Sequence, residues 1–322
     1  MCLTDFAFLF IVAVRFQKEV SMKQSVKNIK TPIPRIAAVH DLSGYGRASL
    51  TVAIPILSSM GMQVCPLPTA VLSSQTASIE DFSFFDLTAQ MQEILENWEN
   101  LDLFFDAVYS GFLGSPLQVD IVERLMDRLG KKEHIFLVDP VLGDDGKLYP
   151  TQTMELVQSM RRLVGKADII TPNFTEVCFL LDMPYEETIT AKQAKEYLKA
   201  LSHLGEKESK KKKSVLITSA PCEEENSLRV LAYDAENKRF WQTKSPKIPS
   251  AYPGTGDSFA SVFLGALLQK DSLPMAMARA ARFIYDVMLM TYGYGTPYID
   301  GIMLEKALPG LSRKDIFLFE DF

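Results

Sequence analysis

The sequence is poor in cysteine and histidine, the residues on which zinc sites and many nucleophilic active sites depend. Its 322 residues include four cysteines, which form no C-x-x-C pair, and three histidines. A disulfide framework and a metal site built from closely spaced Cys and His ligands are therefore excluded as organising features. Scattered cysteines are typical of a reducing compartment, and we expect a cytoplasmic location.

Long hydrophobic runs and clustered positive charge are also missing. The apolar run Phe6–Val14 is too short for a membrane span, which needs about 20 residues, and no basic residue precedes it. The formal net charge is -6, whereas nucleic-acid phosphates are bound by clustered Lys and Arg. The basic run Lys210–Lys213 is expected to form a solvated loop. We therefore expect neither a membrane nor a nucleic acid as a partner.

No stretch rich in proline, glycine or serine divides the chain, and no internal repeat is visible. We therefore expect a single domain over residues 31–322. No helix cap, periodicity or charge pattern ties the beginning of the chain to such a domain. Residues 1–30 are accordingly expected to be a disordered N-terminal extension.

Short apolar strands alternate with amphipathic helices along the chain. Strands are expected at residues 36–39, 64–67, 107–109, 135–138, 169–170 and 215–217, and a β-hairpin at 228–233 and 240–243. Helices are expected at residues 48–60, 87–98, 116–129, 154–164, 190–204, 258–269 and 274–290, and a loop at 73–85. Ser115-Pro116 and a capping box at Thr190 and Gln193 mark two helix starts. The alternation predicts an α/β fold with a mostly parallel sheet covered on both faces.

Polar turns follow the expected strands. They are His40-Asp41, Ser110-Gly111, Asp139-Pro140, Thr171-Pro172-Asn173 and Thr218-Ser219. Open α/β sheets bind their ligands outside the carboxyl ends of the strands. We therefore expect these turns to share one site.

The stretch Ser250–Ala260 places Gly254 and Gly256 directly before a helix that begins around Asp257. Glycines let successive backbone N–H groups converge, and the first N–H groups of a helix attract phosphate. A carboxylate there would repel phosphate, but it could act as a general base that takes a proton from an attacking hydroxyl. Alternatively, Asp257 simply caps the helix.

Acidic and amide side chains at two other strand ends suit a magnesium nucleotide. Asp139 and Asp144 follow one buried strand, and Asn173 and Glu176 stand at a helix start after the next. Proteins hold Mg²⁺ through one or two carboxylates, waters and substrate phosphates. Either motif alone would also fit an ordinary turn or N-cap. Together with Asp257 they indicate phosphoryl transfer from a nucleotide.

Four motifs make a family resemblance specific: Tyr109–Gly114 (YSGFLG), Asp139–Asp144 (DPVLGD), Ala167–Asn173 (ADIITPN) and Gly254–Asp257 (GTGD). In this order they resemble the ribokinase-like superfamily, and within it the pyridoxal (pyridoxine, pyridoxamine) kinases, over about residues 35–300. The resemblance implies a three-layer ribokinase-like kinase domain, usually a homodimer. It also implies use of ATP and Mg²⁺, with a monovalent cation (K⁺ or Na⁺), to phosphorylate the 5′-hydroxyl of a B6 vitamer.

The resemblance also assigns roles to individual residues. Asp257 would be the catalytic base, and the backbone of Gly254, Thr255 and Gly256 would form the anion hole for the transferred phosphoryl group. The nucleotide would be bound by Asp139, Tyr149, Asn173, Thr218 and Ser219, the metal ions by Asp144, Glu176 and Thr171, and the vitamer by Asp41, Thr69 and Phe112.

Two departures from the family pattern concern the vitamer pocket. Asp41 stands where serine is usual, and Leu72–Thr76 (LSSQT) replaces the usual Phe-Ser-Asn-His-Thr. Asp41–Gly44 also resembles the start of hydroxymethylpyrimidine kinases. The sequence favours a B6-vitamer kinase and leaves open a hydroxymethylpyrimidine kinase or a vitamer-binding protein without turnover. For Asp41, it leaves open recognition of the vitamer and simple capping of the turn at Ser43-Gly44.

Overall fold

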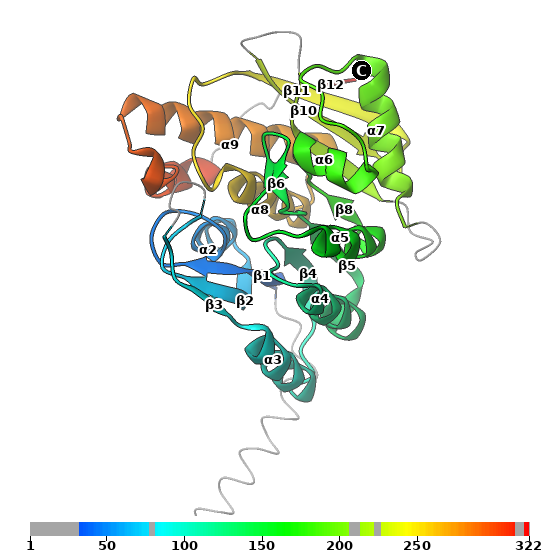
Figure 1. Ribbon diagram of the computed structural model, residues 1–322, viewed down its shortest axis with the longest axis vertical. Coiled ribbons are helices and arrows are strands. Elements are labelled where there is room, and N and C mark those ends of the chain that lie inside the picture. The colour runs from blue at the N-terminus through cyan, green and yellow to red at the C-terminus, as the bar shows by residue number, and fades with distance from the viewer. Residues whose placement is uncertain (1–31, 77–80, 206–212, 222–226, 313–318, 322) are drawn as a thin grey trace, which may run out of the picture.

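A ten-stranded sheet crosses the computed structural model, which describes residues 32–76, 81–205, 213–221, 227–312 and 319–321. Its strands are β1 (Arg35–Ser43), β2 (Gln63–Leu72), β3 (Phe84–Asp86), β4 (Phe105–Ser110), β5 (Gly130–Val138), β8 (Ile169–Ile170), β9 (Ser214–Ala220), β10 (Ser227–Asp234), β11 (Arg239–Pro246) and β12 (Glu320–Asp321). They lie in the order β12-β11-β10-β9-β8-β5-β4-β1-β2-β3 (Figure 1). The strands from β2 to β9 pair in parallel, and antiparallel strands extend both edges.

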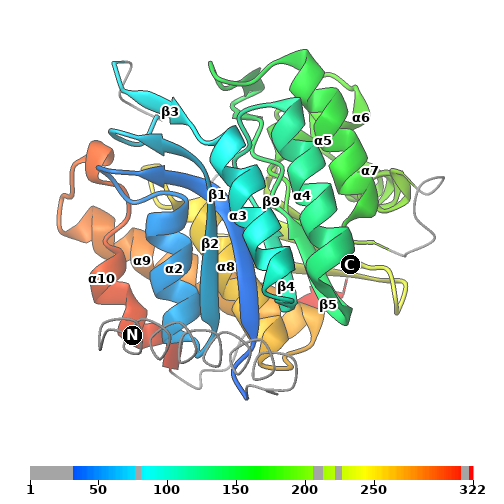
Figure 2. The ribbon, with the colours of Figure 1, turned by 90° about the horizontal axis from the view of Figure 1, so that it is seen from below.

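Helices cover both faces of this sheet (Figure 2). They are α2 (Leu50–Ser59), α3 (Thr88–Asn100), α4 (Pro116–Leu129), α5 (Met154–Lys166), α6 (Phe174–Leu181), α7 (Ala191–His203), α8 (Thr255–Leu268), α9 (Leu273–Gly293) and α10 (Leu304–Ala307). Buried side chains of α3 to α7 form a core on one face, and those of α2, α8, α9 and α10 form a core on the other. The predicted three-layer α/β fold is confirmed.

The central strands supply alternate side chains to the two cores. In β4, Val108 belongs to the core under α3 to α7, whereas Ala107 and Tyr109 belong to the core under α2, α8 and α9. In β5, Phe136 and Leu137 divide in the same way. Successive side chains of a strand point to opposite faces, so a sheet buried on both faces needs uninterrupted apolar strands. This explains why the strands appear in the sequence as short continuous apolar runs.

Two helix starts form as their sequence patterns predict. Ser115 is the N-cap of α4, where its side chain accepts the N–H of Gln118, and Pro116 is the first residue of the helix. Thr190 and Gln193 form a reciprocal capping box at the start of α7. Both arrangements satisfy backbone N–H groups that have no partner within the helix.

The structure corrects the prediction of a loop at residues 73–85. Phe84 and Phe85 belong to β3, which pairs antiparallel with β2 at the edge of the sheet. All three residues of β3 are exposed, so the strand lacks the alternation of apolar and polar side chains that identifies half-buried strands. A small hairpin of β6 (Gly143–Asp144) and β7 (Lys147–Leu148) was not predicted either.

The expected solvated loop at Lys210–Lys213 is also corrected at its last residue. Lys213 is 2% exposed, and its ammonium donates to the carbonyl of Leu204 at the end of α7. A cation stabilises the carbonyl end of a helix because the helix dipole is negative there. The other lysines of the run and the predicted extension, residues 1–30, lie outside the described residues. In the described residues, no helix is long and apolar enough to cross a membrane.

Candidate active site

The first turn of α8 lies where the central parallel strands end. Gly254 precedes the helix with a φ of 87°, a conformation that favours glycine. A Cβ at this position would lie 2.2 Å from the carbonyl oxygen of Arg47. Thr255, Gly256 and Asp257 form the first turn, so their N–H groups stand at the positive end of the helix dipole. The predicted glycine turn before a helix start is therefore present, and phosphate binding there stays a prediction.

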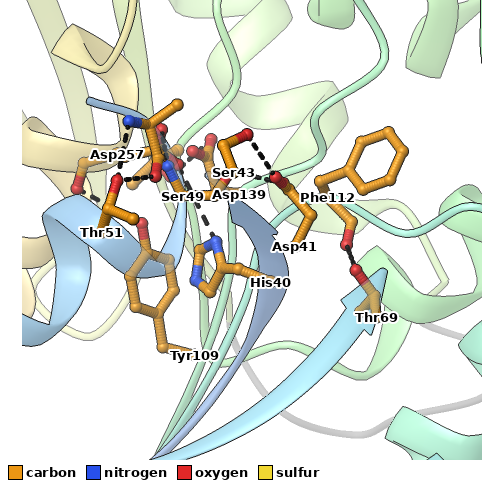
Figure 3. A network of polar contacts seen from close by, with 12 residues as sticks. His40, Asp41, Ser43, Ser49, Thr51, Thr69, Tyr109, Phe112, Asp139 and Asp257 are labelled. Carbon is orange, nitrogen blue, oxygen red and sulfur yellow. Dashed lines mark hydrogen bonds and ion pairs between the residues drawn. The ribbon is translucent and has the colours of Figure 1, made fainter. Parts of the chain in front are cut away.

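Asp257 is the third residue of α8 and does not cap it, because Gly254 occupies the N-cap position. The N–H of Ser49 donates to Oδ2 of Asp257 at 2.8 Å, and Nδ1 of His40 lies 3.8 Å from Oδ1 (Figure 3). Burial, and then the negative charge of Asp41, raise the pKa of Asp257 to about 6, against the opposing effect of the Ser49 N–H. A carboxylate with a raised pKa is a stronger base than an ordinary aspartate.

A cavity of about 270 Å³ opens in front of Asp257. It collects polar side chains from the ends of the strands, as the order of the motifs predicts. The predicted site residues that line it are Asp41, Phe112, Asp139, Asp144, Tyr149, Thr171, Asn173, Glu176, Thr218, Ser219, Gly254, Thr255, Gly256 and Asp257. Residues separated by more than 200 positions in the sequence thus share one cavity.

Thr69 is the predicted site residue that does not line this cavity. It is fully buried, and its hydroxyl donates to the carbonyl of Phe112 at 3.1 Å (Figure 3). Phe112 itself lines the cavity. In this structure Thr69 holds the backbone beside the cavity, and a direct contact with substrate stays a prediction.

A second cavity of about 260 Å³ adjoins the first and shares with it Asp144, Thr218, Ser219, Ala251, Tyr252, Thr255 and Gly256. Its remaining walls are largely apolar and come from β10, α8, α9 and the segment after β11, including Leu228, Val230, Ile248, Phe259, Ile284 and Met288. A flat heteroaromatic group fits such walls, and polar groups at one end suit its phosphates. Sequence reasoning missed these apolar residues because they resemble any core residues of a strand or helix.

Asp139 is buried and lines the first cavity. Its Oδ1 accepts the hydroxyl proton of Thr171 at 3.1 Å. Burial raises the pKa of Asp139, and the charge of Asp257 raises it further. The two carboxyl groups therefore disfavour each other's ionised form, which is typical of a site that binds cations or exchanges protons.

The start of α6 holds the β6–β7 hairpin in place. Asn173 and Glu176 form a capping box, in which Oε2 of Glu176 accepts the Asn173 N–H at 2.8 Å. Oε1 of Glu176 accepts the N–H of Leu142, and the Asn173 amide donates to the carbonyl of Gly143. These bonds fix the strand that carries Asp144. Asn173 and Glu176 therefore act at least as supports for Asp144.

The oxygen groups around Asp144 fit a magnesium ion better than zinc. Asp144 is exposed at the junction of the two cavities, whereas Glu176 is buried with both carboxylate oxygens occupied by N–H groups. Within the described ranges, no group of three or more His, Cys, Asp or Glu side chains could hold a metal ion. Mg²⁺ needs no such group, because waters and substrate phosphates complete its coordination.

Two tyrosines that the sequence analysis did not select also line the cavity. Tyr252 precedes the glycine turn, and Tyr298 follows α9 in a 3₁₀ turn at Tyr298–Asp300. Their rings stack with centroids 6.4 Å apart. Tyr298 carried no signal in the sequence, because its place at the site depends on how the end of α9 folds back.

Comparison with known proteins decides the family. The sequence profile of the phosphomethylpyrimidine kinases matches residues 46–299. The chain belongs to this family. A Bacteroides thetaiotaomicron protein that was assigned as a phosphomethylpyrimidine kinase was crystallised with pyridoxal. It is 48% identical to this chain, with a TM-score of 0.85. That match covers 90% of this chain and 100% of the other.

Two further relatives of this chain are pyridoxal kinases. The structure of pyridoxal kinase from Lactobacillus plantarum is 28% identical, has a TM-score of 0.77, and is matched over 86% of this chain and 96% of that chain. A pyridoxal kinase of Histophilus somni is 28% identical over 265 residues, which are 80% of this chain and 88% of that protein. The predicted resemblance to ribokinase-like pyridoxal kinases is confirmed.

Proposed function

We propose that this protein transfers the γ-phosphoryl group of ATP to the 5′-hydroxyl of a B6 vitamer. The observation that carries the proposal is the place of Asp257. Its carboxyl group, with a raised pKa, stands at the N-terminal turn of α8, in front of a cavity that many polar side chains line and that adjoins a more apolar one. One cavity is suited to a small polar ring, and the other to the base of a nucleotide.

In this reaction Asp257 takes the proton of the 5′-hydroxyl as that oxygen attacks the γ-phosphorus. A new O–P bond forms, the bond between the γ-phosphorus and the bridging oxygen of ATP breaks, and ADP leaves with the electron pair. Negative charge develops on the transferred group. The N–H groups at Gly254, Thr255 and Gly256 lie at the helix terminus, where fixed donors can stabilise that charge.

Asp144 would hold Mg²⁺ together with the phosphates of ATP, and Glu176 would support the bound waters. When bound, Mg²⁺ neutralises charge on the β- and γ-phosphates. The residues proposed to contact the nucleotide line this cavity too, which supports the proposal; they are Asp139, Tyr149, Asn173, Thr218 and Ser219. Thr171 would contribute to a site for K⁺ or Na⁺ near the phosphates.

The vitamer is proposed to lie between Phe112 and Asp41, near the end of β1; both residues line the cavity. The pyridoxal kinase relatives, and the Bacteroides protein that was crystallised with pyridoxal, support a B6 vitamer as the molecule bound there. Hydroxymethylpyrimidine is the second candidate, because the matching family profile is that of phosphomethylpyrimidine kinases.

Product identification tests the proposal. The protein is incubated with pyridoxal, ATP and Mg²⁺, and the products are followed by ³¹P NMR. The proposal predicts a phosphomonoester at the 5′ position and an equal amount of ADP. ATP hydrolysis without a phosphorylated vitamer, or binding of pyridoxal without ADP release, would contradict it. The second outcome would favour a vitamer-binding protein.

We further propose a homodimer in the cytoplasm. The dimer is implied by the family resemblance, and sedimentation equilibrium tests it by the measured mass. The two cysteines in the described part of the chain, Cys65 and Cys178, are free thiols, which is compatible with a reducing compartment.

A further inference from the structure

Ser49 has a backbone conformation that serine rarely adopts. Its φ of 53° and ψ of -127° lie where the Cβ of an L residue is crowded and glycine is favoured. Ser49 stands at the N-cap position of α2, yet its side chain makes no capping hydrogen bond with that helix. Such a strained residue persists only where surrounding contacts hold it, and these residues cluster at functional sites.

Two aspartates bind Ser49, one through its backbone and one through its side chain. The N–H of Ser49 donates to Oδ2 of Asp257 at 2.8 Å, and its hydroxyl donates to Oδ1 of Asp41 at 2.5 Å (Figure 3). The other oxygen of Asp41 accepts the hydroxyl proton of Ser43 at 3.0 Å. Asp41 and Ser49 are 5% and 7% exposed, so water competes little for these bonds.

We propose that Asp41 and Ser49 are positioning residues for the base Asp257. Asp41 holds the hydroxyl of Ser49, this bond maintains the strained backbone, and the Ser49 N–H then fixes Oδ2 of Asp257. Oδ1 of Asp257 faces Nδ1 of His40 at 3.8 Å, beyond hydrogen-bond distance, and is the oxygen that receives the proton. The inference rests on the proposed phosphoryl transfer, within which it gives Asp41 a task.

This role differs from recognition of the vitamer by Asp41. Both oxygens of Asp41 already accept hydroxyl protons from the protein, although the residue lines the cavity. A carboxylate that only recognised the vitamer would not need a link to the base. The chain from Asp41 through Ser49 to Asp257 is continuous, so a change at Asp41 acts on the base for every acceptor.

A change in the pKa of Asp257 can be traced to Asp41 because the other ionisable groups nearby are either neutral or not linked to Asp257 through Ser49. The ionisable groups near Asp257 are His40, Asp41, Tyr109, Asp139 and Tyr149. Burial lowers the pKa of His40 to about 3 and raises the pKa values of both tyrosines, so these three groups are neutral near pH 7. The remaining two groups are the carboxyl groups of Asp41 and Asp139, and Asp41 is the one that is linked to Asp257 through Ser49. Loss of its charge alone should lower the pKa of Asp257, whereas loss of the bond from the Ser49 N–H, which has the larger effect, should raise it.

A double-mutant cycle between Asp41→Ala and Ser49→Gly tests the proposal. Alanine has no oxygen that could accept the Ser49 hydroxyl proton, so in the otherwise natural chain Asp41→Ala should lower kcat by about tenfold, with KM for the vitamer changed less than about threefold. Glycine adopts the φ of residue 49 without strain, so its N–H stays in place without Asp41. In the Ser49→Gly background, Asp41→Ala should therefore cost less than about threefold in kcat. Equal losses in both backgrounds would overturn the proposal.

Ser43→Ala is the matched control, because it removes a hydroxyl from the same carboxylate without breaking the link to Asp257. Its loss of kcat should be smaller than that of Ser49→Ala, which breaks the link. Pyridoxal, pyridoxine and pyridoxamine are compared for each variant. Equal losses among the three support positioning of the base. A loss confined to KM and unequal among them would show direct recognition and overturn the proposal.

A measurement without turnover separates this inference from the proposed function. Carboxyl-¹³C aspartate is incorporated, and the signal of Asp257 is assigned by its absence from Asp257→Asn. Asp41→Ala should shift the titration of Asp257 to higher pH, because it displaces the Ser49 N–H, whose lowering effect on the pKa is larger than the raising effect of the Asp41 charge. In the Ser49→Gly background, where the N–H stays in place, the same change should shift the titration to lower pH, and the acidic limb of kcat/KM should move with each shift. An unchanged titration would overturn the inference. Absence of vitamer turnover in the natural protein, with the titration shifted as expected, would contradict only the proposed function.

Discussion

At the scale of single residues, Asp257→Asn tests the base with almost no change in shape. Asparagine cannot take the proton, so kcat should fall by about 10²- to 10⁴-fold, the usual contribution of a general base. The Ser49 N–H can still donate to the amide oxygen, so the turn should persist. ATP binding measured by calorimetry should survive, because the proposed anion hole uses backbone N–H groups. A variant with nearly natural kcat would exclude Asp257 from this role.

The raised pKa of Asp257 predicts the pH dependence of the reaction. Burial is the largest cause of the rise from 3.8 to about 6. A base works in its ionised form, and a carboxyl group is ionised above its pKa. The value of kcat/KM should therefore be constant near neutral pH and fall about tenfold per pH unit below about 6. Asp257→Asn serves as the control, because its residual rate should lack this limb. An acidic limb near 3.8 would show that the pKa is not raised.

The place of Asp257 in the first turn of a helix could be predicted from the sequence, but its orientation could not. Two glycines before an amphipathic run predict a helix start at this point, and α8 begins there. The contact of Asp257 with Ser49 spans 208 positions and depends on a positive φ at a serine. No local sequence pattern predicts the positive φ of Ser49, because glycine or asparagine would be expected at a residue with this backbone conformation.

At the scale of elements, two glycines of the α8 turn should respond differently to alanine. Gly254→Ala places a Cβ 2.2 Å from the Arg47 carbonyl oxygen at a φ of 87°, whereas a Cβ on Gly256 meets nothing within 4 Å. Gly254→Ala should lower the free energy of unfolding by about 1–3 kcal/mol or more, measured by urea denaturation. Gly256→Ala should keep its stability and lose kcat, because the methyl group enters the space proposed for the phosphoryl group. Equal stability of the two variants would contradict the account of this turn.

The two capping boxes provide a second matched pair. Asn173→Ala and Thr190→Ala should each destabilise the protein by about 0.5–2 kcal/mol in thermal or urea unfolding. Asn173 also holds Gly143 of the hairpin that carries Asp144, whereas Thr190 caps α7. Asn173→Ala alone should therefore raise KM for ATP, by about tenfold. An equal effect of both variants on KM would mean that the hairpin does not position Asp144 for the nucleotide.

Strong periodicity and clear caps made most elements predictable, and short exposed elements escaped prediction. The helix α4 was identified from Ser115-Pro116 and an apolar face, and it forms within the predicted bounds. The strand β3 has three residues, and its partner β2 lies earlier in the chain. It exists only through this tertiary contact, so no sequence window contains its cause. The strands β6 and β7 have two residues each and pair with each other across Asp145-Gly146, where both residues have a positive φ. Asp-Gly is a local hairpin signal, and the sequence analysis did not use it.

At the scale of the whole molecule, the parallel sheet explains why distant motifs meet. Parallel strands end at the same edge, so the carboxyl ends of β1, β4, β5, β8 and β9, with the residues that follow them, gather in front of α8. Strand ends could therefore be assigned to one site from the sequence. The contribution of the C-terminal segment could not be assigned. Arg47 binds Glu305 and the carbonyl of Asp300, which brings Tyr298 to the cavity.

The central claim is that this molecule is a kinase for B6 vitamers, and side-by-side turnover tests it most directly. ADP release with ATP and Mg²⁺ is measured for pyridoxal, pyridoxine, pyridoxamine and hydroxymethylpyrimidine under identical conditions, with Asp257→Asn as the blank. The account predicts that at least one B6 vitamer exceeds hydroxymethylpyrimidine in kcat/KM by about tenfold or more, a difference of about 1.4 kcal/mol in transition-state binding. Turnover of hydroxymethylpyrimidine alone, or ADP release no faster than the blank with every acceptor, would contradict it.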